Sequence, residues 1–462
     1  MTIPLVYGFV GREDGVRPLA LALGVTAACG AALAWSLERP CREMTRREGL
    51  LLVVAAWITV CLFGSLPFYL SPYFPNFTDA MFEATSGFST TGASILTDVE
   101  VLPRSLQFWR HFTHWLGGMG IVLLGVAVLP LVGHGGLQLY RAEFSGARSE
   151  RLKPRIAQTA LALWRIYVLL SIAEYLALRW AGMDRFEAIC HTFSTVSTGG
   201  FSTRNLSVGG FNSPAIEIIV VVFMILGGAS FIQHHRFWVE RQPRRVLGDV
   251  EIRFYLLLIG AATAVVTVAL LARSTYPAHE ALRRALFQVV TINTCTGFVT
   301  ADYELWPPLT HLLLLALMYA GGCTGSTAGG LKSARIVLLG KVVGREFRRM
   351  VEPRGVFAVR LGGQVVPEPV IQSLLNLVYL ALAVNFASCL LLAATGVDVL
   401  TSISAVASAM FNVGPGLGTV GPAENYAHLP GLAKWVLCGD MIAGRLEFYT
   451  VLVLLTPAFW RR

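Results

Sequence analysis

The stretch TINTCTGFVTADYE (residues 291–304) lies between two long apolar segments, one at 252–272 and one that begins at residue 309. It is too short to cross a hydrocarbon core, which takes about 20 apolar residues in a helix. It is also too rich in Thr and Gly to continue either neighbour. Related stretches occur three more times, as STTGAS (89–94), STGGFS (197–202) and NVGPGLG (412–418). The fold of the chain therefore depends on the structure that this polar loop adopts between two apolar segments in each of the four places.

The composition indicates a membrane protein. Of the 462 residues, 55% are hydrophobic and 14% are charged, whereas soluble domains have about 25% charged residues. Apolar runs of about membrane-spanning length recur, for example at 18–37, 51–70 and 216–232. These runs are continuous rather than alternating, so they argue against a β-barrel. The sequence predicts an all-α polytopic protein in a lipid bilayer.

The positive charge has a distribution that argues against nucleic-acid binding. The net charge is +9, but the basic residues crowd into certain loops, which alternate with loops such as 202–213 and 299–308 that carry little positive charge. This is the positive-inside pattern. The basic loops and the C-terminus are therefore expected in the cytoplasm. The basic groups are Arg39, Arg42, Arg46 and Arg47; Arg141, Arg148, Arg151, Lys153 and Arg155; Arg236, Arg241, Arg244 and Arg245; Lys341, Arg345, Arg348, Arg349 and Arg354; and Arg461 and Arg462.

One plan repeats four times along the chain: a spanning run, a short helix-compatible segment, a Thr/Ser/Gly loop, and a second spanning run. The second spanning runs are predicted at about 107–132, at 213–235, from residue 309 onward and at 432–458. The short segment cannot cross, so it must dip into the membrane and return. Non-helical backbone at that depth is tolerated only where it lines water or is buried in protein. We therefore expect four pseudo-symmetric helix–pore-helix–helix units around one pore. The predicted boundaries are 1–48 for an N-terminal extension with one full transmembrane helix, and 49–135, 156–240, 250–350 and 369–462 for pore units 1 to 4.

The loops have the chemistry of a site for a monovalent cation. A loop that replaces the hydration shell of such an ion must present backbone carbonyls at short range. Gly allows backbone angles that aim consecutive carbonyls the same way, and Thr and Ser add hydroxyl oxygens. Ordinary turns use the same residue types, so a single loop would be weak evidence. Four loops at matching positions predict a ring of dipoles without formal charge.

At these residues the chain resembles the Trk/Ktr/HKT superfamily of potassium transporters, and it is most similar to the bacterial Trk-type transmembrane subunits. The resemblance covers residues 38–462 and rests on the four loops, on GGCTGSTAGGLKSARI (321–336) and on AGRLEFYTVLVLLTPAFW (443–460). It implies potassium as the transported ion, no other cofactor, and a place in a bacterial cytoplasmic (inner) membrane. Members of the superfamily in which the first filter glycine is replaced by Ser tend toward sodium. That substitution is absent from this sequence. The implied filter residues are Thr91, Gly92, Thr198, Gly199, Gly200, Thr296, Gly297, Val413 and Gly414. Of the adjacent Gly199 and Gly200, we prefer Gly200 as the selectivity glycine.

Two parts of the chain depart from the family pattern. In the fourth loop Pro415 follows the glycine and Asn412 replaces a Thr or Ser, so we expect an asymmetric contribution to the ring. At the N-terminus, members of this type begin with two extra helices, whereas only 18–37 reads as a full span here. Residues 3–15 resemble the end of the other helix, so the chain either starts late or is shorter than its relatives.

A glycine-rich break marks a candidate gate. Residues 321–330 contain five glycines, and each costs about 1 kcal/mol relative to Ala in a helix. The resemblance implies an intramembrane loop that obstructs the pore, with Gly325, Ser326 and Thr327 at its centre. The alternative is close helix packing through small residues. Arg445 lies in the last apolar span, where a charge is expensive. The resemblance places it in the pore as a barrier, and the alternative is an ion pair with Asp440 or Glu447.

Other polar residues in apolar runs have less specific explanations. His111 and His114 could form a haem or metal pair, but we interpret them as interfacial residues at a helix entry. Glu83 and Glu174 could carry protons, although structural hydrogen bonds explain them as well. The eight Cys show no paired spacing, so we interpret them as packing residues.

The sequence therefore predicts a potassium-uptake protein rather than an enzyme. It has no nucleotide-binding motif of its own. The resemblance implies a homodimer that docks on a cytosolic nucleotide-binding regulatory ring. One alternative is the potassium-translocating subunit of an ATP-driven pump, and another is a sodium/potassium transporter of the same superfamily. A membrane-embedded enzyme would need intramembrane His pairs or an acid–His arrangement, which we do not find. Channel-like flow and proton- or sodium-coupled transport both stay open.

Overall fold

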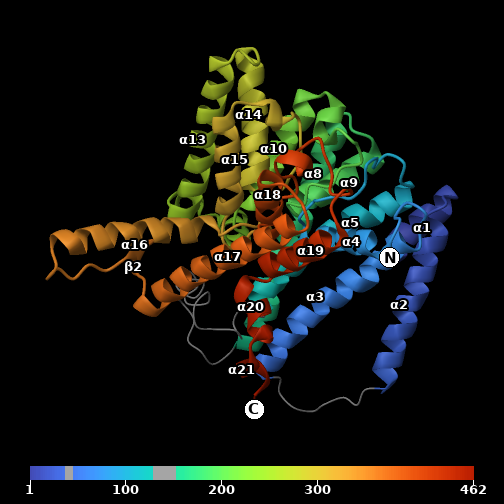
Figure 1. Cartoon of the computed structure of the whole chain (residues 1–462), viewed down its shortest axis with the longest axis horizontal. Helices are drawn as coiled ribbons and strands as arrows, with labels where there is room; N and C mark the ends of the chain where they lie inside the picture. The colour runs from blue at the N-terminus through green and yellow to red at the C-terminus, as the bar shows by residue number, and fades with distance from the viewer. Residues whose placement is uncertain (37–44, 128–151, 462) are drawn as a thin grey trace.

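The computed structural model describes residues 1–36, 45–127 and 152–461, and the chain in these ranges is almost entirely helical (Figure 1). Its only strands within these ranges, β1 (Arg360–Leu361) and β2 (Gln364–Val365), form a short antiparallel hairpin. The helices before the first unit are α1 (Thr2–Gly11) and α2 (Val16–Ser36). The prediction of an all-α polytopic protein is confirmed.

The remaining helices follow the predicted plan four times. The first unit has α3 (Arg46–Tyr69), α4 (Phe77–Ser89) and α5 (Arg104–Ala127), and the second has α8 (Leu152–Trp180), α9 (Arg185–Val196), η1 (Ser207–Phe211), α10 (Pro214–Gly228) and α11 (Phe231–Trp238). After the linking helix α12 (Pro243–Leu247), the third has α13 (Val250–Ala272), α14 (Ala278–Asn293), η2 (Tyr303–Leu305), α15 (Pro308–Ala320) and α16 (Ser333–Val351). The fourth has α17 (Glu368–Ala394), α18 (Val399–Met410), η3 (Gly418–Val420), α19 (Gly431–Arg445), α20 (Phe448–Leu452), η4 (Val453–Leu455) and α21 (Pro457–Trp460).

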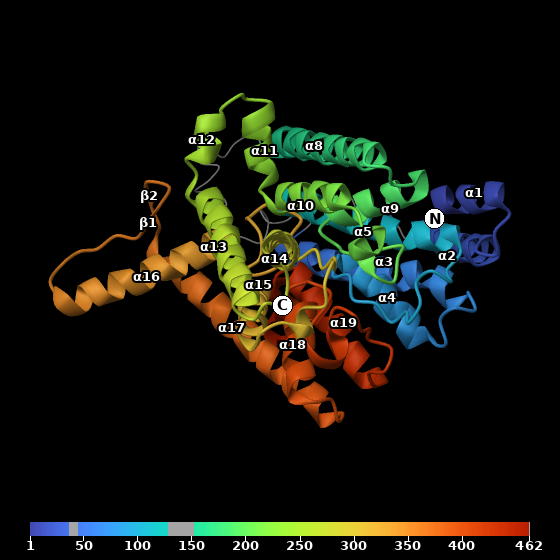
Figure 2. The same cartoon turned by 90° about the horizontal axis from the view of Figure 1, so that it is seen from above.

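The four units follow one another around the centre of the molecule in chain order, as the view from above shows (Figure 2). Units 1 and 4 are thereby neighbours, although they lie at opposite ends of the chain. A buried ion pair joins them, because Lys434 Nζ on α19 lies 2.6 Å from Asp79 Oδ1 on α4. The predicted unit boundaries stay predictions, and the end of unit 1 at residue 135 lies outside the described residues.

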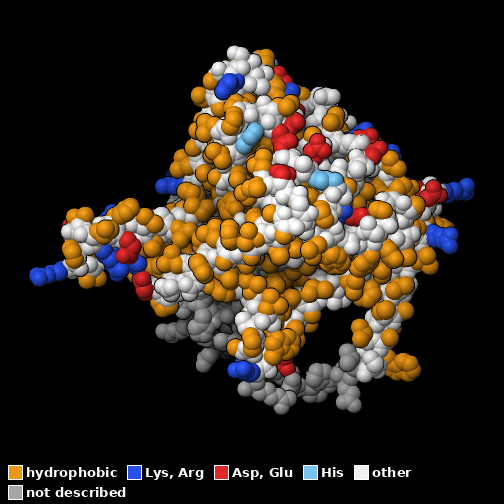
Figure 3. Space-filling model, viewed as in Figure 1, with side chains coloured by type: hydrophobic (Ala, Val, Ile, Leu, Met, Phe, Trp, Pro, Cys, Tyr) orange, Lys and Arg blue, Asp and Glu red, His pale blue; other side chains and the backbone are white. Residues whose placement is uncertain are grey.

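The outer helices have the surface of membrane spans. Within the described residues, five helices are long and apolar enough to cross a membrane: Val16–Ser36, Arg47–Tyr69, Ala160–Trp180, Val250–Ala272 and Glu368–Ala394. Only 11–39% of each apolar window is buried. Large apolar side chains such as Leu257, Val268 and Phe386 are exposed on them, and hydrophobic side chains cover much of the face in Figure 3. An exposed apolar belt of this extent is expected for a surface that contacts lipid.

The short helices α4, α9, α14 and α18 are instead buried inside the molecule. Residues 79–89 of α4 are all buried, as are most residues of the other three. Three of them begin at a side-chain cap, from Asn76, Asp184 and Asp398, which satisfies an amide that the first turn leaves free. We call these four helices the pore helices.

Three of the second spans are broken rather than continuous. The sequence predicted one span at 213–235, but α10 and α11 meet at an angle of 102°. Cys323 N donates to Gly228 O, and Phe231 N donates to Gly325 O, so the third unit supplies partners for the broken turn. The predicted span at 432–458 is likewise interrupted after Arg445, where Glu447 has a φ of 59°. The third break lies at 321–332 between α15 and α16, where the sequence predicted a break at 321–330. The predicted end of the first unit's second span, at 132, lies outside the described residues.

Candidate functional site

All four pore helices end in the same backbone motif. The second residue before each predicted filter glycine has a left-handed φ of 54–55°, although none of these residues is Gly: Thr90, Thr198, Cys295 and Asn412. The next amide then bonds a carbonyl five residues back, in the pairs Thr91–Ser86, Gly199–Ser194, Thr296–Thr291 and Val413–Ser408, at 2.7–2.9 Å. This is the Schellman cap, usually built on Gly. Two of the four residues, Thr90 and Thr198, are β-branched, and the left-handed conformation is strained for such residues. All four caps turn the chain away from the helix in the same way.

The residue after each cap motif is a glycine with positive φ. The values are 83° for Gly92, 82° for Gly200, 84° for Gly297 and 106° for Gly414. Gly200, and not Gly199, is therefore structurally equivalent to the other three. Position 199 requires glycine for a steric reason and not for its φ. The imidazole of His114 occupies the space that a Cβ at this position would need.

The four glycines form a closed ring in which each packs against the next unit. A Cβ on Gly92 would overlap Gly199 O, one on Gly200 would overlap Thr296 O, and one on Gly297 would overlap Val413 O. Gly414 closes the ring, because its Cβ would lie 2.8 Å from Thr91 O. The structure thus brings together all nine predicted filter residues, which come from four segments distant in the sequence. All four glycines also line one open cavity of about 550 Å³.

The cavity wall carries both basic and acidic side chains, the acidic ones being Asp302 and Glu424. The three arginines on its wall are each paired with a carboxylate: Arg110 with Glu83 at 2.6 Å, Arg204 with Glu187 at 2.7 Å and Arg284 with Glu280 at 2.5 Å. Below it, the C-terminal ends of four pore helices converge on the ring, and a helix C-terminus carries about half a negative charge. The helix dipoles at the ring and the carboxylates of Asp302 and Glu424 on the cavity wall therefore both favour a cation.

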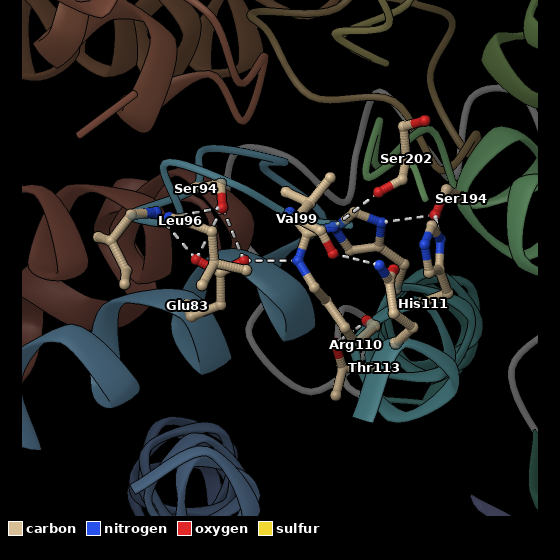
Figure 4. A network of polar contacts seen from close by, with 12 residues as sticks. Glu83, Ser94, Leu96, Val99, Arg110, His111, Thr113, Ser194 and Ser202 are labelled. Atoms are coloured by element: carbon tan, nitrogen blue, oxygen red, sulfur yellow. Dashed lines mark hydrogen bonds and ion pairs between the residues drawn. The ribbon is translucent and has the colours of Figure 1, made fainter. Parts of the chain in front are cut away.

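A buried polar cluster connects units 1 and 2 beside the ring (Figure 4). Glu83 on α4 accepts from Arg110 Nε at 2.6 Å, from Ser94 Oγ and from Ile95 N. Arg110 also donates to Ser202 O at 3.1 Å and lies 3.5 Å from the ring centroid of Phe201. Glu83 thus has a structural role in this protein. Sequence reasoning did not single out Arg110, and a charge inside an apolar run was the available signal.

The interpretation of His111 and His114 as interfacial residues is wrong, because both are fully buried. Their Nδ1 atoms lie 2.8 and 3.1 Å from Ser194 Oγ on the pore helix α9. His114 also stacks on Phe201, with 3.9 Å between the ring centroids. The described residues contain no group of three or more potential metal ligands. The two histidines therefore pack unit 1 against the second pore helix and its loop.

The glycine-rich break forms a non-helical loop directly below the pore helices. Thr327 Oγ1 lies 3.0 Å from Val196 O, at the end of α9, and 3.1 Å from Gly227 O. Gly329 is packed so closely that a Cβ would overlap Phe411 O, just after α18. Helix breaking and close packing through small residues therefore both occur in residues 321–330. Ser326 Oγ donates within the loop, to Cys323 O at 2.6 Å, and Gly325 has a φ of 74°.

Arg445 reaches the same place from the fourth unit. Its side chain is 4% exposed, and Nη1 donates to Thr327 O at 2.7 Å. The predicted alternative partners are engaged elsewhere, since Glu447 pairs with Arg335 at 2.7 Å and Asp440 bonds Ser388 Oγ at 2.9 Å. Within the described ranges, no carboxylate forms an ion pair with Arg445. Its charge is therefore held by backbone carbonyls beside the loop.

Glu251, on the first turn of α13, holds both ends of this loop. Its Oε1 accepts from Thr324 N at 2.6 Å and from Ala334 N at 3.1 Å. Sequence reasoning missed this residue because its partners lie 73 and 83 positions away.

These features define a polytopic helical membrane protein in which four pore loops meet at one central cavity above an intramembrane loop. The chain belongs to the TrkH family of cation transport proteins, whose family model matches residues 19–462. It is 41% identical to the Trk system potassium uptake protein TrkH of Salmonella typhimurium, over 100% of this chain and 96% of that protein. It is 34% identical to the Trk system potassium uptake protein TrkG of Escherichia coli, over 100% of this chain and 95% of that protein. The fold matches the crystal structure of the potassium transporter TrkH from Vibrio parahaemolyticus with a TM-score of 0.92 at 38% identity, covering 100% and 96% of the two chains. The predicted superfamily resemblance is confirmed.

Proposed function

We propose that this protein takes up potassium ions across the bacterial cytoplasmic membrane through the ring of Gly92, Gly200, Gly297 and Gly414. The observation that carries the proposal is the ring itself, in which each positive-φ glycine packs against a carbonyl of the next unit. The relatives described above are named as potassium uptake proteins. An ion at the ring exchanges water for carbonyl oxygens, and a ring without formal charge suits a monovalent cation.

We further propose that the loop at 321–330 and Arg445 form the gate below this filter. Gly325, Ser326 and Thr327 lie at the centre of the loop, and Arg445 donates to Thr327 O. A resting barrier of this kind combines a physical obstruction with a fixed positive charge. Movement of the loop would remove both together, because the arginine is bonded to the loop.

The assembly and orientation are also proposals. The basic loops at 236–245 and 341–354 would face the cytoplasm with the C-terminus, and would dock a nucleotide-binding regulatory ring. The chain would act as a homodimer. The predicted alternative of an ATP-driven pump subunit requires an ATPase that co-purifies with the chain, and that experiment separates the two.

Replacing Gly297 by Ser is expected to abolish the preference for potassium over sodium. A Cβ at this position would overlap Val413 O and lie 2.9 Å from Pro415 Cδ, so the ring must widen. Overpacking costs about 1–3 kcal/mol, and a free-energy change of that size corresponds to roughly 5- to 150-fold in the ratio of the two ions. The measurement is potassium and sodium flux into liposomes that contain the purified protein. Gly439→Ser is the matched control, because a Cβ on Gly439 has nothing within 4 Å.

Two results would contradict the proposal in different ways. If the wild-type protein prefers potassium and Gly297→Ser does too, selectivity lies outside the ring. If the wild-type protein moves no cation, even with a regulatory partner added, the transport function itself is wrong.

A further inference from the structure

The carbonyl of the fourth filter glycine differs from the other three in its hydrogen bonding. Gly414 O accepts from Ser408 Oγ at 2.7 Å and from Tyr426 Oη at 2.8 Å. A carbonyl oxygen has two lone pairs, so two hydroxyl donors leave none for a cation. Among the described residues, no hydrogen bond reaches the carbonyl oxygens of Gly92, Gly200 or Gly297.

The carbonyls two residues further on provide an internal comparison, because all four accept a hydrogen bond from the preceding unit. The pairs are Tyr426 N–Ser94 O at 2.9 Å, Arg110 Nη1–Ser202 O at 3.1 Å, Gly209 N–Val299 O at 3.0 Å and Tyr303 Oη–Gly416 O at 2.8 Å. This layer therefore keeps the fourfold pattern. The exception is confined to the glycine layer and to unit 4.

The hydroxyl on the pore helix is present in every unit, but it is used differently. The residue six positions before the filter glycine is Ser86, Ser194, Thr291 or Ser408. Ser194 bonds His111 and His114, and the hydroxyls of Ser86 and Thr291 have no partner among the described residues. Only in unit 4 does this hydroxyl bond the glycine carbonyl, where Tyr426 joins it.

The chain around Gly414 also differs from that around the other filter glycines. Pro415 follows it, and a residue before Pro is kept out of the α region, a restriction that the other three glycines do not have. The φ of Gly414 is 106°, whereas the other three glycines have 82–84°. A Cβ there would also have more clearance from the next unit than at the other three glycines.

We propose that Tyr426 and Ser408 are specificity-determining positioning residues, which occupy the Gly414 carbonyl so that the glycine layer coordinates a cation with three free carbonyls instead of four. The inference rests on the proposed potassium function. Potassium, as the larger ion, accommodates more oxygen ligands than sodium, so the number of carbonyls at the layer affects discrimination. A three-carbonyl layer binds the ion less tightly and releases it more readily.

The test uses the full-length protein in liposomes, with Tyr426→Phe and Ser408→Ala as variants. Each variant frees one lone pair of Gly414 O. We expect the potassium-to-sodium flux ratio to rise, and the KM for potassium to fall, by roughly two- to tenfold. Tyr255→Phe is the matched control, because Tyr255 is also buried and its hydroxyl donates to a backbone carbonyl outside the filter loops, Ile225 O at 3.2 Å. Its ratio should stay at the wild-type value.

Four results would overturn the inference. The ratio could be unchanged in both variants, or it could fall, which would mean that the hydroxyls shape the loop and do not withhold a ligand. Tyr255→Phe could shift the ratio as much as Tyr426→Phe, which would indicate general loosening. In these three cases a potassium-selective wild-type protein leaves the proposed function intact. A wild-type protein that moves no cation fails the proposed function and this inference with it. Thermal unfolding of the three variants identifies any that misfold, and Ser408→Ala carries the test if Tyr426→Phe does not fold.

Discussion

An Arg445→Ala variant is expected to pass cations about 100-fold faster than the wild-type protein when no partner is present. The guanidinium is buried and has only carbonyl partners, Thr327 O at 2.7 Å and Gly117 O at 3.4 Å. No carboxylate within the described ranges neutralises it. A cation that passes within ~6 Å is repelled by about 3 kcal/mol at an effective dielectric constant of ~20, and this corresponds to roughly 100-fold in rate. The measurement is resting potassium flux in liposomes.

The control separates the charge from the hydrogen bond. Arg445→Lys keeps the charge but loses the planar pair of donors, so its resting flux should stay near that of the wild-type protein. If flux rises equally in Arg445→Lys and Arg445→Ala, the contact with the loop forms the barrier and the charge does not. If a folded Arg445→Ala variant shows wild-type flux, Arg445 has no part in gating.

An Arg110→Met variant is expected to lose about 3–5 kcal/mol of stability, because the Glu83 carboxylate would stay buried without its partner. Arg110 is 2% exposed and Glu83 is fully buried. The same change removes the donor to Ser202 O, so the second filter loop should also loosen and the potassium preference should decline. Thermal unfolding in detergent measures the first effect, and the liposome flux ratio measures the second.

The double variant Glu83→Gln/Arg110→Met tests whether the unpaired carboxylate of Glu83 causes the loss of stability. Gln carries no charge and can still accept from Ser94 Oγ and Ile95 N, so the double variant should be more stable than Arg110→Met alone. The flux ratio should not recover in parallel, since Ser202 O still lacks its donor. An Arg110→Met protein that unfolds at the wild-type temperature would contradict the prediction.

The ring glycines could be found from the sequence because their signal is local and repeated. Each follows a helix-compatible segment within a few residues, and a positive φ favours glycine over other residues there. The choice of Gly200 over Gly199 rested on the residues that follow, and the φ of 82° at Gly200 agrees with it. The break at 321–332 was also a local signal, from five glycines in ten residues.

The features that sequence reasoning missed depend on contacts between distant segments. Tyr426 lies 12 residues after Gly414 in a loop without periodicity, so nothing local indicates that it bonds a filter carbonyl. The kink between α10 and α11 follows Gly227 and Gly228, which lie inside an apolar run that was predicted to form one span. The kink has its bonding partners in the third unit, at Cys323 and Gly325. His111 and His114 were misassigned because flanking aromatic residues look alike at a membrane interface and in a protein core.

The closed ring of glycines has a consequence for how this protein can change over evolution. Each filter loop packs tightly against the loop of the next unit, so unit 4 restricts unit 1 through the contact between Gly414 and Thr91. Asn412 Nδ2 strengthens this contact by donating to Thr91 Oγ1 at 2.9 Å. The four loops are consequently not interchangeable modules. A chimera that receives one loop from a relative should work only if the residues it touches in the adjoining units are transferred with it. Substitutions around the ring are therefore expected to be inherited in matched sets.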